Sequence, residues 1–117
     1  MLDKKLLKAK IELMTRSVFL STINLGIKHV ISDAVATAGT DCKQIMYNPD
    51  FCKNLTIVEL TGLMAHECWH IAFMHKLRQG NRNHVLWNKA ADYVINNMLL
   101  DSGYTLPSGG LADKIFI

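Results

Sequence analysis

Apolar residues in the first part of the chain return every three or four positions, with lysines between them. This spacing predicts an amphipathic helix over residues 3–24 that ends near Gly26. The apolar positions expected to face the core are Leu6, Leu7, Ile11, Met14, Val18 and Phe19. We favour a scaffold helix over a helix on a membrane surface, because the stripe has no bulky aromatic anchor other than Phe19.

Residues 29–48 have the pattern of extended chain. Two short β-prone runs, residues 35–38 and 44–47, flank residues 39–43, which have the composition of a hairpin connection. The Asn-Pro-Asp sequence that follows predicts a turn. His29 has no ligand candidate near it in the sequence, so we expect a surface or capping role, and we expect Tyr47 to be an ordinary strand residue.

Two longer helical patterns follow. Thr56 and Glu59 have the spacing of a capping box, which predicts a helix over residues 57–79 that ends at Gly80. After a polar connection, a second helix is predicted over residues 84–101, with Gly103 as its stop. Its expected apolar face is Trp87, Ala91, Val94, Ile95 and Met98, and Asn88, Asp92 and Asn96 line the border of that face. Together these elements predict an α+β fold.

Length and composition restrict the class of protein. The chain has 117 residues, enough for one small domain, which we place over residues 1–117. Its net charge of +3 comes without a basic stripe interleaved with aromatics, so a nucleic-acid partner is not indicated. Three cysteines without a C-x-x-C pair favour a reduced, cytoplasmic setting. We expect neither a signal peptide nor a membrane span. The turn-like tail from residue 106, which ends on apolar residues, predicts a truncated C-terminus.

The segment from His66 to His70, with the sequence His-Glu-Cys-Trp-His, has the H-E-x-x-H spacing of a metal site. Residues four apart on a helix differ by about 40° around its axis, so both imidazoles can share one ion. Glu67 lies about 100° further round, where its carboxylate can reach a water on that ion. Two imidazoles predict Zn²⁺. The alternative is a metal-free core in which both histidines are satisfied and Glu67 forms an internal salt bridge.

The third zinc ligand has two candidates. His75 lies five residues after His70, about 140° round a continuous helix, and can ligate only if the helix breaks before it. Asp92 lies on the second helix, which must pack against the first, and we favour it. Asn96, one turn further, is expected to bond an imidazole N–H and orient that ring.

The chain resembles a known family in four places: residues 46–51, 63–75, 87–96 and 106–107. The H-E-x-x-H segment, followed by W-N-x-A-x-D-x-x-I-N, is similar to the metallopeptidase domain found ahead of VWA-like domains in bacteria and phages. This resemblance implies a zincin-like fold, zinc on His66 and His70, Glu67 as the catalytic carboxylate and Asp92 as the matching acidic position. It also implies a VWA-like domain or another protein as a partner.

Our functional hypothesis is a zinc-dependent hydrolase that acts on peptide bonds in a peptide or protein substrate. Zinc would acidify its bound water, and Glu67 would take the proton of that water and pass it to the leaving amine. A strand edge at residues 35–38 is expected to pair with the substrate backbone. Candidates for stabilising the oxyanion are Tyr93, His84 and Tyr104. The rival hypothesis is a non-catalytic adaptor in which zinc only stabilises the fold.

Overall fold

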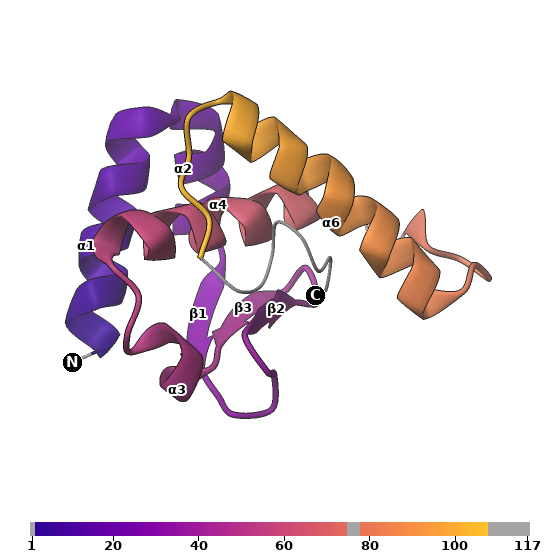
Figure 1. The fold of residues 1–117 in the computed structure, drawn as a ribbon, viewed down its shortest axis with the longest axis horizontal. Helices are drawn as coiled ribbons and strands as arrows, with labels where there is room; N and C mark the ends of the chain where they lie inside the picture. Colours follow the sequence, from indigo (N-terminus) through magenta and orange to yellow (C-terminus); the bar gives the residue numbers. More distant parts are fainter. Residues whose placement is uncertain (1, 75–77, 108–117) are drawn as a thin grey trace.

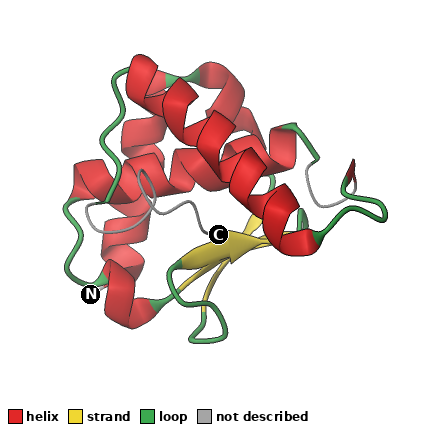
Figure 2. Ribbon diagram, turned by 45° about the vertical axis from the view of Figure 1, so that its right-hand side comes forward, coloured by secondary structure: helices red, strands yellow, loops and turns green. Residues whose placement is uncertain are grey.

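The computed structural model describes residues 2–74 and 78–107 of the chain (Figure 1). Its helices and strands follow the order α1 (Leu2–Arg16), α2 (Val18–Leu25), β1 (Lys28–Ile31), β2 (Ala38–Thr40), β3 (Gln44–Tyr47), α3 (Pro49–Cys52), α4 (Ile57–Ala72) and α6 (His84–Asp101). Helix α4 crosses the middle of the molecule, the sheet lies on one side of it, and α1, α2 and α6 pack around it (Figures 1 and 2). The predicted α+β class is confirmed.

The N-terminal segment forms two helices, so the prediction of one helix over residues 3–24 is wrong. The chain leaves the α1 conformation at Ser17, whose backbone is extended (φ −152°, ψ 114°) and whose side chain accepts a hydrogen bond from the backbone N–H of Leu20. A serine that caps a new helix in this way satisfies an otherwise unpaired N–H group, which offsets the cost of breaking the first helix.

The face of α1 that packs on α4 also differs from the predicted face. Helix α1 buries Leu6, Ala9 and Leu13. Most of the predicted stripe lies at the surface, because Leu7, Ile11, Met14, Val18 and Phe19 are each at least 50% exposed. Both stripes have helical spacing, so periodicity alone could not decide between them.

The three strands form a mixed sheet in the order β1-β3-β2. The predicted hairpin is confirmed as the antiparallel pair β2 and β3, although β2 begins three residues later than residue 35. Strand β1 pairs parallel to β3 and was not predicted as a separate strand. Within the hairpin connection, Asp41 accepts hydrogen bonds from the backbone N–H groups of Lys43 and Gln44. The predicted turn at Asn48 is the N-cap of the short helix α3.

Helix α4 begins as predicted and ends early. Thr56 and Glu59 form the reciprocal capping box. The helix ends at Ala72, not at residue 79, because Phe73 caps it and Met74 takes a left-handed conformation (φ 54°). No glycine or proline marks this break in the sequence. Within α4, a side chain at Gly62 would collide with the backbone of Thr105, so glycine is needed there for the chain after α6 to cross α4.

Helix α6 has the predicted bounds, begins at the cap Asn83 and is followed by Gly103 with φ 88°. Its buried residues are Ala91, Asp92, Ile95, Asn96 and Leu99. Asp92 and Asn96 therefore belong to the face that packs on α4, whereas Val94, expected in the core, is 51% exposed. None of the helices in the described part of the chain is long and apolar enough to cross a membrane.

Candidate metal centre

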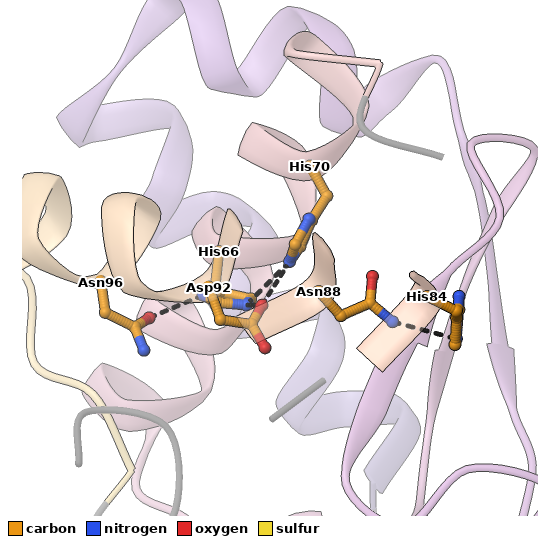
Figure 3. Close-up of polar contacts among 6 residues, drawn as sticks. All are labelled: His66, His70, His84, Asn88, Asp92 and Asn96. Atoms are coloured by element: carbon orange, nitrogen blue, oxygen red, sulfur yellow. Dashed lines mark hydrogen bonds and ion pairs between the residues drawn. The ribbon is translucent and has the colours of Figure 1, made fainter. Parts of the chain in front are cut away.

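Three side chains from two helices converge where α6 crosses α4 (Figure 3). His66 and His70 lie one turn apart on α4, and Asp92 reaches them from α6. The Asp92 Oδ1 atom lies 3.0 Å from the His66 Nε2 atom and 2.7 Å from the His70 Nε2 atom. The two Nε2 atoms lie 3.1 Å apart. Ligand atoms of a tetrahedral zinc site lie about 3.3 Å apart. This triangle is thus close to the size that one zinc ion requires.

The buried carboxylate of Asp92 has an unusual feature. Asp92 and His66 are fully buried, and His70 is 8% exposed. The Oδ2 atom of Asp92 has no hydrogen-bond partner among residues 2–74 and 78–107. A buried carboxylate oxygen without a partner costs free energy, because it has lost its hydration. A cation held by this group of side chains would remove that cost, so the donor set fits a metal ion.

Asn96 sets the tautomer of His66. The Nδ1–H group of His66 donates to the Asn96 Oδ1 atom at 2.7 Å, since that carbonyl oxygen can only accept. In the neutral imidazole this leaves a lone pair on Nε2, which points toward the Asp92 carboxylate and the His70 ring. Two electron-rich atoms at this distance require a proton or a metal ion between them. The predicted orienting role of Asn96 agrees with this contact.

The pKa values of His66 and Asp92 are shifted in opposite directions, and each side chain is a cause of the shift in the other. Burial alone would lower the pKa of His66, but the hydrogen bond to Asp92 and the negative charges of Glu67 and Asp92 outweigh it and raise that pKa. Burial would raise the pKa of Asp92, but hydrogen bonds from His66 and His70 lower it below its ordinary value. The cluster therefore stabilises one positive charge next to an ionised carboxylate.

Glu67 lies beside the cluster and is not part of the triangle. It is buried, and it lines a cavity of about 330 Å³ together with His70. Burial raises the pKa of Glu67, and the positive charges of His66 and His70 act against that increase. The remaining walls of the cavity come from Val35, Gly39, Thr40, Asp41, Cys42, Met46, His84 and Asn88. That the Glu67 carboxylate reaches a water on the ion stays a prediction.

The structure separates the other predicted site residues. Of the two candidates for the third ligand, it brings Asp92 to the histidines. His75 lies outside the described residues, and the argument against it from a continuous helix is wrong, because α4 ends at Ala72. Tyr93 is 56% exposed, and Tyr104 lies 5.0 Å from the Arg16 guanidinium rather than in the cavity. Among the oxyanion candidates, only His84 lines the cavity, where Asn88 is a neighbour that we did not predict.

The fold and this cluster define a small α+β protein with a His-His-Asp group that can hold a metal ion. A family described as "Putative metallopeptidase domain" matches residues 2–114. The chain therefore belongs to this family. No curated protein and no solved structure gives a significant match. The association with a VWA-like domain stays a prediction.

Proposed function

We propose that the protein is a zinc-dependent hydrolase of the zincin-like type that cleaves peptide bonds. The observation that carries this proposal is the position of Glu67, a buried carboxylate that lines a cavity beside the His66, His70 and Asp92 triangle. The metallopeptidase description of the family supports the same reaction class.

Zinc is the proposed metal because of the ligand set. Two imidazoles and one carboxylate with an open fourth position are typical of catalytic zinc. Such an ion polarises a carbonyl group and lowers the pKa of its bound water to about 7. His66, His70 and Asp92 would hold it, and Asn96 would keep the His66 ring in the ligating orientation through Nδ1–H.

Glu67 is the proposed general base. Its pKa is raised by burial, which brings the carboxylate closer to the pH at which it must both accept and release a proton. The carboxylate would accept a proton from the attacking water in the cavity and then donate it to the leaving amine. A cation held by the neighbouring ligands would favour the ionised form of this carboxylate.

The edge strand β2 is the proposed contact for the substrate backbone. In the order β1-β3-β2, one side of β2 is unpaired within the sheet, and its residues Gly39 and Thr40 line the cavity. An extended peptide can add to such an edge through main-chain hydrogen bonds. This places the proposed edge at residues 38–40, slightly beyond the predicted residues 35–38.

The cavity also weighs against the adaptor hypothesis. A structural zinc site is closed by four protein ligands. Across the described part of the chain, the only group able to hold a metal has three members, and His70 from that group borders the cavity. A cavity next to a ligand and a carboxylate suits catalysis and is unnecessary for a structural ion.

The substitution Glu67→Gln tests the proposal. We expect cleavage in a broad peptide-library screen to fall by about 10²- to 10⁴-fold, since the base is lost while the shape of the side chain is kept. Zinc content by elemental analysis and the thermal unfolding midpoint should stay at wild-type values. Glu12→Gln, at a partly exposed residue of α1 that pairs with Arg16, is the matched control and should keep full activity. If the zinc-loaded wild-type protein and the Glu67→Gln variant both cleave no peptide in the screen, the adaptor hypothesis is favoured.

A further inference from the structure

Four polar residues of α6 form one row. His84, Asn88, Asp92 and Asn96 follow one another at four-residue steps, so each lies next to the one before it in a row that turns slowly round the helix (Figure 3). The inner pair, Asp92 and Asn96, is buried in the metal centre. The outer pair, His84 and Asn88, lines the cavity that Glu67 and His70 also line. The row thus connects the candidate metal site to the space in front of it.

The outer pair is held by two hydrogen bonds. The Asn88 Nδ2 group can only donate, so the His84 Nε2 atom accepts from it at 3.1 Å. The proton of the neutral imidazole is then on Nδ1, from which it is donated to the Gln79 Oε1 atom at 3.1 Å. This chain fixes the orientation of the Asn88 carboxamide at the cavity wall. His84 has both ring nitrogens engaged, which makes it a poor oxyanion donor.

Helix stability does not require this arrangement. The first turn of α6 is already capped by Asn83, whose side chain accepts from the backbone N–H of Leu86. Hydrogen bonds between partly exposed side chains add little to the free energy of folding. A chain of three polar groups at the wall of a cavity is more consistent with recognition of a ligand.

The remaining hydrogen-bonding atoms of Asn88 indicate the ligand. Among the described residues, none accepts from the second N–H of its carboxamide, and none donates to its Oδ1 atom. The carboxamide therefore offers one donor and one acceptor side by side. A backbone amide of a peptide offers the complementary acceptor and donor.

We propose that Asn88, oriented by His84 and Gln79, binds a backbone amide of the substrate next to the bond that is cleaved. This inference rests on the proposed function and makes it more specific. It assigns to α6 a part of the substrate-binding wall opposite β2, with recognition of main chain and not of a particular side chain.

Two zinc-binding probes of different length test this assignment. Acetohydroxamate can bind the ion alone, whereas an N-acetyl-dipeptide hydroxamate also presents backbone amides to the cavity wall. Affinities are measured by isothermal titration of the zinc-loaded protein, together with its zinc content. We expect Asn88→Ala to weaken the dipeptide probe by about 10-fold, the effect of losing two neutral hydrogen bonds, and to leave acetohydroxamate unchanged.

Three variants make the test specific. Asn88→Asp keeps the acceptor and loses the donor, so we expect a smaller loss for the dipeptide probe. His84→Ala leaves Asn88 in place without its orienting partner and should cost about 3-fold, less than one hydrogen bond. Asn97→Ala, on the exposed side of α6, is the matched control and should bind both probes like wild type.

The possible contrary results have separate meanings. If Asn88→Ala binds the dipeptide probe as tightly as wild type, or loses affinity for both probes equally, the role of Asn88 is overturned while the proposed hydrolase stands. If wild type takes up zinc and binds neither probe, the cavity does not admit a substrate to the ion. Both the proposed function and this assignment are then wrong.

Discussion

Helix α4 contributes to two polar clusters that each contain histidine, and they differ in the balance of donors and acceptors. The metal cluster consists of His66, His70, Asp92 and Asn96. The second, which we call the His29 cluster, consists of Asn24, His29, Tyr47 and Cys68. Cys68 lies two residues from both His66 and His70, so it points to another side of α4.

In the His29 cluster, the histidine has a partner for each nitrogen. The His29 Nε2–H group donates to the Asn24 carbonyl oxygen at 3.0 Å, and the Nδ1 atom accepts from the Tyr47 hydroxyl at 3.0 Å. Burial lowers the pKa of His29, which favours the neutral ring that this pattern needs, although the Asn24 carbonyl acts against it. Our prediction of a surface or capping role for His29 and of an ordinary strand role for Tyr47 missed this cluster.

The metal cluster has an excess of acceptors. The His66 lone pair and the Asp92 carboxylate face one another, and the Asp92 Oδ2 atom has no partner among the described residues. His29 is partly buried, whereas His66 is fully buried. The two clusters also differ in their balance of donors and acceptors, and only the unbalanced cluster gains by binding a cation.

The largest expected effect is on metal binding in Asp92→Ala. We expect this change to weaken zinc binding by more than the roughly 100-fold typical of losing an orienting residue, because it removes a ligand. Chelator should lower the unfolding temperature of the wild type and leave that of the variant nearly unchanged. Elemental analysis and thermal unfolding are the measurements, with Asp101→Ala on the same helix as control. Loss of zinc in His75→Ala and not in Asp92→Ala would assign the third ligand to His75.

A smaller effect is expected for Asn96→Ala. This variant keeps the three ligands and removes the acceptor that fixes the His66 tautomer, so zinc affinity should fall about 10- to 100-fold. Competition with a coloured zinc chelator measures the affinity. Asn96→Asp retains an acceptor for Nδ1–H and should recover most of the loss. Unchanged affinity in Asn96→Ala would show that packing alone orients the ring.

The smallest expected effect is in the His29 cluster. Tyr47→Phe leaves the partly buried His29 Nδ1 atom without its donor, so the free energy of unfolding should fall by about 1 kcal/mol, as measured by urea denaturation. Zinc affinity should not change, because this cluster is already balanced without an ion. A loss of zinc in Tyr47→Phe as large as that in Asn96→Ala would remove the distinction between the two clusters.

Local signals in the sequence were sufficient for several elements. The Thr56 and Glu59 capping box marks the start of α4, and the bounds of α6 follow from its periodicity and from Gly103. The H-E-x-x-H spacing places both imidazoles on one side of a helix. These features depend on contacts within three or four residues, so the sequence contains all the information that they need.

Other features depend on how the helices pack. The sequence alone determined that His66, Glu67 and His70 share a helix and that an acidic residue on the next helix was a candidate ligand. Only the tertiary structure decided which stripe of α1 is buried, that Asp92 meets the histidines, and that Asn88 reaches the cavity beside Glu67. These outcomes depend on the angle and register at which two helices cross, which arise from many side chains far apart in the chain and from no local pattern.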